Sequence, residues 1–173
     1  MITAIEETTD IGLTLQRVQL NKPYEQIVAD FERLIPAVDV ARLENLVDSN
    51  GDSGQLTAAI EEMTGGKHLM RFYRVRSGDL FTVLSGSRVE SVKYIVGNVF
   101  IAQQVFARDL TAGLHVPFAV NIYGRNGITI MEYFRPSSFL AYVSSDDGTK
   151  EIGRRLDELM NKLVRNLGGS QPT

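Results

Sequence analysis

A glycine followed by an asparagine, Gly97 and Asn98, stands where a predicted strand ends and a predicted helix begins. The first turn of a helix presents unpaired backbone N–H groups and the positive end of the helix dipole, and glycine lets a ligand oxygen approach the backbone closely. These two residues are therefore one candidate site for an anion. A structural interpretation is also open, because the Asn98 side chain can cap the helix while Gly97 permits a tight turn.

A second candidate lies on a predicted hairpin, with strands at residues 116–123 and 128–134. The Asn-Gly pair in its loop favours a type I′ turn, because it supplies the two residues with positive φ. Side chains alternate between the two faces of a strand, so Asn121, Tyr123 and Glu132 should share one face. Such a polar group among apolar neighbours is typical of a dimer surface, a shallow ligand pocket or an ordinary solvent-facing side of a sheet.

Acid–base chemistry requires an ionisable group with a partner in the same cleft. Glu132 is one candidate, and Tyr133, which the alternation places on the core-facing side of the hairpin, is the other. Glu132 has no evident second carboxylate beside it in the sequence pattern. We therefore predict no catalytic residue, while an enzyme acting on a small polar or anionic substrate is the first alternative.

Metal and nucleophile chemistry has little support. The chain has no cysteine, and its two histidines, His68 and His115, lack the spacing that brings two ligands to one metal. The acidic run at residues 48–54 resembles a calcium loop, but its twelfth position is Ala59 instead of glutamate. The motifs of a nucleophile elbow and of a phosphate loop are missing from the sequence. We predict no metal and no cofactor.

The elements that must position these residues follow two periodicities. Residues 12–20 alternate as a strand does, and residues 23–35 repeat apolar side chains every three or four positions, as a helix does. Two shorter helical patterns flank the acidic run between residues 39 and 64. The segments 69–75 and 80–84 are predicted as two strands joined by a turn.

A third strand at residues 91–96 leads into a helix at 99–108, and the hairpin follows. The last helix has a strict apolar stripe, formed by Ile152, Leu156, Leu159, Met160, Leu163, Val164 and Leu167. Strands joined by short turns imply an antiparallel sheet, and helices at both ends of the strand block must bury their stripes on it. We predict an α+β fold of two layers, with a mainly antiparallel sheet covered on one face by helices.

Length and composition limit the class of protein. The 173 residues fit a single domain, with an ordered core at about residues 12–168 and a disordered tail at 170–173. The formal net charge of −3 gives no reason to expect nucleic acid or an anionic membrane as a partner. No apolar run reaches the ~18–20 residues that cross a bilayer, and the acidic start differs from a secretory signal, so we expect a cytoplasmic protein.

Several short motifs carry a resemblance to a known family. They are Gly97-Asn98, Arg108-Asp109, Ala112-Gly113-Leu114, Pro117, Tyr123-Gly124, Tyr133 and Arg135-Pro136. In these motifs the chain resembles the family catalogued as domain of unknown function 302, over about residues 66–140. The resemblance implies the same two-layer architecture and a dimer. Val99 departs from the family pattern Gly-Asn-Pro, which makes a backbone N–H available in the first helical turn.

These observations lead to one hypothesis and two alternatives for function. We expect a homodimeric module that binds a small polar or anionic ligand, or a protein partner, through the exposed side of its hairpin. The candidate ligand-binding residues are Gly97, Asn98, Asn121, Tyr123, Glu132 and Tyr133. The alternatives are the enzyme mentioned above and a structural or assembly module, which would show a large exposed apolar patch.

Overall fold

The computed structural model describes residues 8–144 and 146–169. Their strands form one antiparallel sheet in the order β1-β5-β4-β3-β2. The strands are β1 (Leu15–Leu20), β2 (Met70–Val75), β3 (Ser91–Gly97), β4 (Phe118–Arg125) and β5 (Ile128–Phe134). The predicted α+β fold, with an antiparallel sheet and helices packed on one face, is confirmed.

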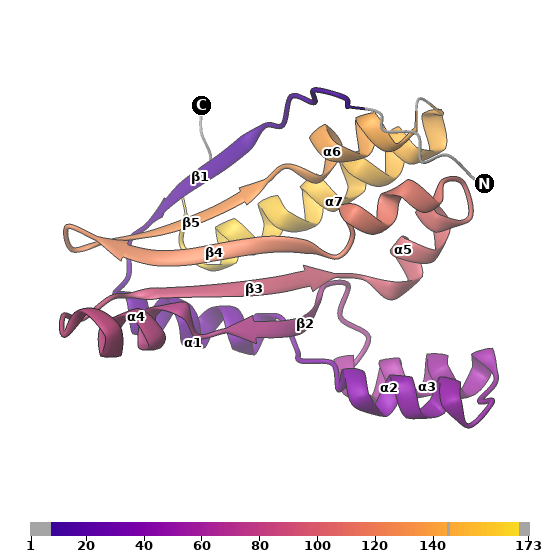
Figure 1. The fold of residues 1–173 in the computed structure, drawn as a ribbon, viewed down its shortest axis with the longest axis horizontal. Helices are drawn as coiled ribbons and strands as arrows, with labels where there is room; N and C mark the ends of the chain where they lie inside the picture. The colour runs from indigo at the N-terminus through magenta and orange to yellow at the C-terminus, as the bar shows by residue number, and fades with distance from the viewer. Residues whose placement is uncertain (1–7, 145, 170–173) are drawn as a thin grey trace, which may run out of the picture.

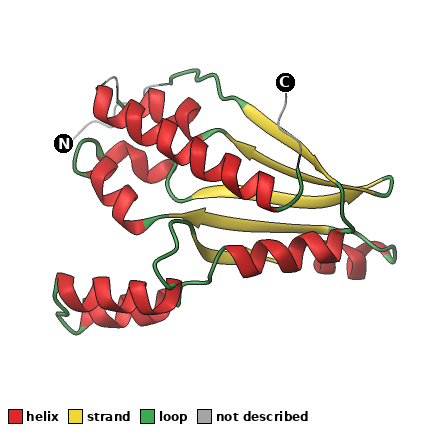
Figure 2. Ribbon diagram, turned by 180° about the vertical axis from the view of Figure 1, so that it is seen from behind, coloured by secondary structure: helices red, strands yellow, loops and turns green. Residues whose placement is uncertain are grey.

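The helices that build the main core with the sheet lie on one of its faces (Figures 1 and 2). They are α1 (Tyr24–Leu34), α5 (Val99–Phe106), α6 (Pro136–Val143) and α7 (Asp147–Asn166). In α7 the predicted apolar stripe faces the sheet, and Leu156 and Met160 are fully buried. An amphipathic helix of this length is stable only when its stripe is covered, so α7 belongs to the core.

A helical hairpin stands beside this body, with α2 (Val40–Asp48) and α3 (Ser53–Thr64) side by side in Figure 1. The acidic run predicted as a turn connects the two helices. Asp52 caps α3 by accepting from the Gln55 backbone N–H at 2.8 Å, and the Gln55 side chain accepts in return from the Asp52 backbone. The hairpin meets the sheet through a small second core of Val38, Ile60 and Met70.

The prediction of a strand at residues 80–84 is wrong, because these residues belong to helix α4 (Ser77–Ser85). Gly86 ends the helix in the left-handed conformation, and its N–H donates to the Thr82 carbonyl. A side chain at Gly78 would lie 2.5 Å from the Val89 carbonyl oxygen, so only glycine lets this helix pack against the start of β3. The apolar residues of α4 suit a strand equally well, so local pattern does not distinguish the two.

The structure has two elements after β3 that the sequence analysis did not predict. A 3₁₀ helix, η1 (Leu110–Leu114), begins at Asp109, whose carboxylate accepts from the Thr111 N–H at 2.8 Å. Helix α6, for which the sequence analysis predicted no element, begins with Pro136 in its first turn. Eight residues are too few to show helical periodicity, and α6 is held by packing against α7.

The predicted β4–β5 hairpin is confirmed, including its register. Asn126 and Gly127 have φ values of 53° and 75°, as a two-residue type I′ turn requires. Asn121 lies opposite Glu132, and Tyr123 lies opposite Ile130. In the described part of the chain, no helix has the length and apolar character needed to cross a membrane.

Candidate functional site: the open face of the sheet

One face of the sheet is left partly exposed, and we call it the open face. Its side chains come from alternate positions of all five strands. They are Leu15, Arg17 and Gln19 of β1, Tyr73 and Val75 of β2, Ser91, Lys93 and Ile95 of β3, Ala119, Asn121 and Tyr123 of β4, and Ile128, Ile130, Glu132 and Phe134 of β5. The register aligns five of the apolar residues in one row and places most of the polar ones beside it, while Val75, Ile128 and Ile130 are apolar residues outside the row. We call the two parts the apolar half and the polar half.

The apolar half is a row across the sheet that consists of Leu15, Tyr73, Ile95, Ala119 and Phe134. Leu15 pairs with Phe134, Ala119 pairs with Ile95, and Ile95 pairs with Tyr73. Phe134 and Ala119 line one groove, so the row is continuous. Leu15, Phe134 and Tyr73 are 48%, 46% and 55% exposed. Large apolar side chains aligned on one surface are a common mark of an interaction site.

The polar half contains a shallow basin of about 460 Å³, which we call the polar basin. It is lined by Arg88, Val89, Glu90, Ser91, Asn121, Tyr123, Gly124 and Glu132. The predicted group of Asn121, Tyr123 and Glu132 thus lies together in one hollow. Its amide, phenol, hydroxyl and carboxylate groups can donate and accept hydrogen bonds to a small polar molecule.

Glu132 is the centre of the hydrogen bonding in the polar basin. The Tyr123 hydroxyl donates to Glu132 Oε1 at 2.9 Å, and the Arg17 guanidinium forms an ion pair with the same carboxylate. Burial, followed by the adjacent carboxylate, raises the pKa of Tyr123. Tyr123 therefore keeps its proton near neutral pH and acts as a hydrogen-bond donor.

The charges at the rim of the basin are also paired within the protein. Arg88 forms an ion pair with Glu25 of α1 and another with Glu90, at 3.1 Å. Across the sheet, Lys93 pairs in register with Asn121 and is exposed. The basin thus combines matched charges with neutral polar groups, and this composition suits a neutral or zwitterionic ligand better than a strongly charged one.

Tyr133 does not join this group, because its side chain points to the opposite face of β5. It is 5% exposed and packs in the main core. Burial raises the pKa of Tyr133 to about 12, so its hydroxyl stays protonated at neutral pH. Glu132 and Tyr133, the two alternative acid–base candidates, therefore lie on opposite faces of the sheet, as the alternation predicts.

Gly97 and Asn98 lie at the junction of β3 and α5, away from the polar basin. Asn98 caps α5, since its Oδ1 accepts from the Ile101 N–H at 2.9 Å, and its Nδ2 donates to the His68 carbonyl at 2.6 Å. A side chain at Gly97 would lie 3.1 Å from Pro117 Cβ. Both residues thus have structural roles, and the close approach that Gly97 allows is made by the protein itself.

The sequence analysis missed Arg17 of β1, which forms an ion pair with Glu132 of the basin, and the lining segment 88–91 at the start of β3. Asn121 and Glu132 are neighbours through a two-residue turn, so local pattern was enough to place them together. Arg17 lies opposite Glu132 only because β1 pairs with β5, over 100 residues later in the chain. Complementary charges on two predicted strands are the only sequence feature that could have suggested this pair.

A second charged cluster lies on the helix-covered side, at the β2 edge. Glu32 of α1 accepts from the Tyr94 hydroxyl at 2.7 Å and pairs with Arg71 and Arg74 at 3.1 and 3.2 Å. Burial, followed by the hydrogen bond to Glu32, raises the pKa of Tyr94. These contacts join α1 to β2 and β3, and we interpret the cluster as structural.

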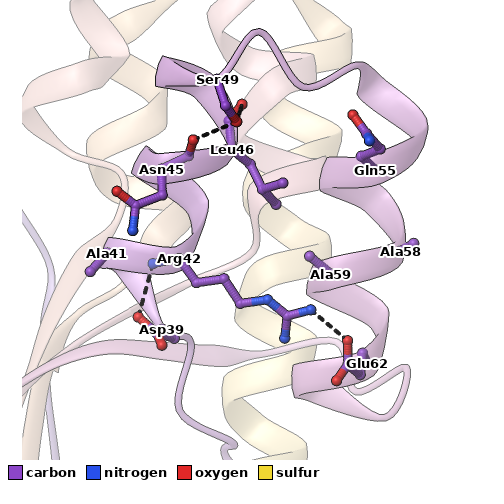
Figure 3. Close-up of a pocket in the computed structure, with 10 residues that line it drawn as sticks. All are labelled: Asp39, Ala41, Arg42, Asn45, Leu46, Ser49, Gln55, Ala58, Ala59 and Glu62. Carbon is purple, nitrogen blue, oxygen red and sulfur yellow. Dashed lines mark hydrogen bonds and ion pairs between the residues drawn. The ribbon is translucent and has the colours of Figure 1, made fainter.

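A groove of about 600 Å³ runs between α2 and α3 (Figure 3). Arg42 of α2 reaches across it and forms an ion pair with Glu62 of α3 at 2.7 Å. Asp39 accepts from the Arg42 backbone N–H, and Ser49 donates to the Asn45 carbonyl. The charged groups of the groove therefore already have partners within the protein, and we assign no ligand to it.

Comparisons with known proteins bear on the fold of this chain. The family model described as "Domain of unknown function DUF302" matches residues 47–167. A crystal structure of an uncharacterized conserved DUF302 protein from Bacillus stearothermophilus is similar, with a TM-score of 0.60 and 14% sequence identity. The similarity covers 88% of this chain and 97% of that one. No curated protein matches the chain. At this identity the structural similarity supports the fold alone.

Proposed function

The chain belongs to the DUF302 family, and from its own surface we propose that it is a homodimeric module that binds a small polar ligand. The apolar row would form the contact between two copies, and the polar basin would hold the ligand. The observation that carries the proposal is the division of one open sheet face into an exposed apolar half and a hydrogen-bonding half.

The size of the open face supports a second copy as the occupant of the apolar row. Five strands of six to eight residues form the sheet. At ~4.8 Å between strands and ~3.3 Å per residue, such a face measures roughly 24 by 23 Å. This footprint includes the polar half and is of the same order as the ~800 Å² of accessible surface that each partner buries in a stable complex, so a second copy seated on the apolar row would also cover part of the polar half. Two such faces can pack about 10 Å apart.

The polar basin supports a ligand with several hydroxyl or amide groups and little net charge. Glu132 and Arg88 already have charged partners, so a strongly charged ligand would have to displace an ion pair. Asn121 and Ser91 have small polar side chains that can accept or donate without such a displacement. The basin lies toward the hairpin end of the face, beside the apolar row, and a second copy on the row would narrow its mouth.

The dimer is tested by measuring mass with light scattering at tens of micromolar. We expect the wild type to have twice the chain mass and Phe134→Lys to be monomeric and folded, because it places a charge in the middle of the apolar row. Thr111→Lys, at an exposed position outside the sheet, is the matched control and should remain dimeric. A monomeric wild type would contradict the proposal.

The ligand is tested separately, by titrating small polyols, amides and amino acids while recording backbone NMR shifts. We expect a hit to shift the resonances of Asn121, Tyr123 and Ser91, and Asn121→Ala to weaken its binding about tenfold or more, through the loss of one or two hydrogen bonds. Gln104→Ala, an amide removed from the exposed side of α5, is the control. Binding that Asn121→Ala leaves unchanged would exclude the basin.

Helix α4 favours a second candidate, an assembly module that binds through another surface. Four of its apolar side chains are exposed, which is unusual for a nine-residue helix. They are Leu80, Phe81, Val83 and Leu84. Val83→Lys distinguishes the two candidates in the light-scattering experiment. A dimer that Val83→Lys dissociates and Phe134→Lys leaves intact would assign self-association to α4.

A further inference from the structure

A cavity of about 220 Å³ lies between α5, α7 and the ends of β2, β3 and β4, on the opposite side of the sheet from the polar basin. The two sites have no lining residue in common. The side chains that form most of its wall are apolar: Phe72, Val99, Ile101, Phe106, Phe118 and Leu156.

The cavity occupies the seam between the two cores of the protein. Ile101, Phe118 and Leu156 belong to the main core, whereas Phe72 and Val99 pack against the small core beneath α2 and α3. Helix α5 takes part in both, through Ile101 in the main core and Val99 against the small one, so the cavity lies where the two packed units meet. A space between two separately packed units is a common position for a ligand pocket.

The backbone around the cavity limits its collapse. Asn98 ties the start of α5 to the loop before β2 through the His68 carbonyl, and it caps the helix through the Ile101 N–H. A side chain at Gly97 would lie 3.1 Å from Pro117 Cβ, so the backbones at these two residues already approach closely. The wall is thus made of packed strands and a capped helix, and a site on such elements keeps its shape.

The chemistry of the wall determines what the cavity can hold. The polar side chain in the wall of the cavity is that of Asn98. Both the oxygen and the nitrogen of this amide already form hydrogen bonds within the protein. A charged or strongly polar ligand would lose its hydration without gaining partners, at a large free-energy cost. Apolar cavities of ~150 Å³ lined by such residues stay dry and accept benzene.

We propose that this cavity is a binding site for a compact apolar group, such as a single aromatic ring or a short branched hydrocarbon chain. Its volume exceeds the ~150 Å³ that accepts benzene, so it admits one ring with a substituent. The ligand is either a small apolar molecule or the apolar end of a larger one whose polar part extends into solvent past the half-exposed Phe72 and Phe106. The site is independent of the proposed dimer and of the polar basin.

The test uses toluene as the probe and methyl NMR of the full chain as the main measurement. We expect toluene to shift the methyl resonances of Ile101, Val116 and Leu156 and to leave Ile122, in the core of the same sheet, unchanged. At roughly ten times its Kd, toluene should raise Tm by about 3–6 °C. Benzoate has a ring of the same size with a carboxylate attached directly to it, so its ring cannot enter the cavity fully without desolvating the charge, and it should bind far more weakly than toluene.

Two variants locate the binding. Ala102 lines the cavity, so Ala102→Leu should fill it and abolish both toluene effects. Ala107→Leu makes the same substitution at an exposed position just after α5, and should bind toluene as the wild type does. If circular dichroism shows that Ala102→Leu is unfolded, Val99→Phe fills the cavity from its half-exposed side instead.

Three results would overturn the proposal. The first is a wild type whose Ile101, Val116 and Leu156 resonances do not respond to saturating toluene. The second is a folded cavity-filling variant that still shows the full shift. The third is stabilisation by sulfate, relative to chloride at equal ionic strength, that Ala102→Leu removes, since that result would assign the site to an anion.

Discussion

The two faces of the sheet are built from the same strands and have opposite properties. On the covered face, Val120, Ile122 and Met131 are fully buried against α1, α6 and α7. On the open face, their immediate neighbours in sequence include Asn121, Tyr123 and Glu132. Alternation along a strand separates the two sets of side chains, but the helices decide which set is removed from water.

The comparison also applies to carboxylates. Asp157 of α7 is buried and accepts from Arg135, from the Ser137 hydroxyl at 2.6 Å and from the Ser137 backbone N–H at 3.1 Å. Glu132, on the open face, accepts from Arg17 and Tyr123. Asp157 joins α7 to the start of α6 and so stabilises the covered layer. Glu132 binds Arg17 and Tyr123, whose polar groups can also form hydrogen bonds with water.

The largest expected effect comes from placing a charge on each face at adjacent positions. Val120→Asp should abolish the cooperative thermal transition, because burying an unpaired carboxylate costs several kcal/mol out of a total stability of ~5–15. Ala119→Asp, one residue earlier and exposed, should keep that transition while disrupting the proposed dimer. Thermal melts followed by circular dichroism measure both variants.

If both variants unfold, the open face is packed within the monomer, and the contrast between the faces fails. If Val120→Asp melts like the wild type, the assignment of the covered face is wrong.

A smaller difference should separate the two carboxylates. We expect Asp157→Ala to lower the free energy of unfolding by about 1–3 kcal/mol, because it removes a buried acceptor and leaves the partly buried Ser137 donors at the start of α6 without a partner. Glu132→Ala should cost under ~1 kcal/mol, since Arg17 is largely exposed and can be hydrated. Urea denaturation of both variants provides the comparison, and equal losses would contradict it.

A third difference, confined to alkaline pH, is a pH dependence that distinguishes the tyrosines of the two faces. Burial raises the pKa of Tyr133 to about 12, compared with ~10 for the unfolded chain. Between these values the folded protein retains a proton that the unfolded chain loses, so stability should fall as pH rises from ~10 to ~12. Tyr133→Phe should remove up to ~1.4 kcal/mol of that fall per pH unit.

Tyr123→Phe is the matched control on the open face. It should leave most of the fall in the free energy of unfolding between pH ~10 and ~12 unchanged. The measurement is the free energy of unfolding at a series of pH values above 9. A slope that Tyr133→Phe does not change would show that the Tyr133 hydroxyl is hydrated in the folded protein.

Local patterns were enough to predict most of the elements. The Asn-Gly turn, the cap at Asn98 and the apolar stripe of α7 each depend on residues within a few positions of one another. Prediction failed at α4, because its short apolar segment fits the pattern of a strand as well as that of a helix. The packing of this helix on β3 requires glycine at position 78, which no local pattern indicates. Helix α6 was missed because its stability comes from α7.

By itself, the sequence determined the class of fold and the grouping of Asn121, Tyr123 and Glu132, because alternation and a two-residue turn are local properties. Only the tertiary structure placed Arg17 and residues 88–91 around that group and aligned Leu15, Phe134 and Tyr73 into one apolar row. It also enclosed the cavity between the two cores, using residues from β2, α5 and α7. The physical reason is strand order and layer packing, which bring together residues that are far apart in the chain and have no common local pattern.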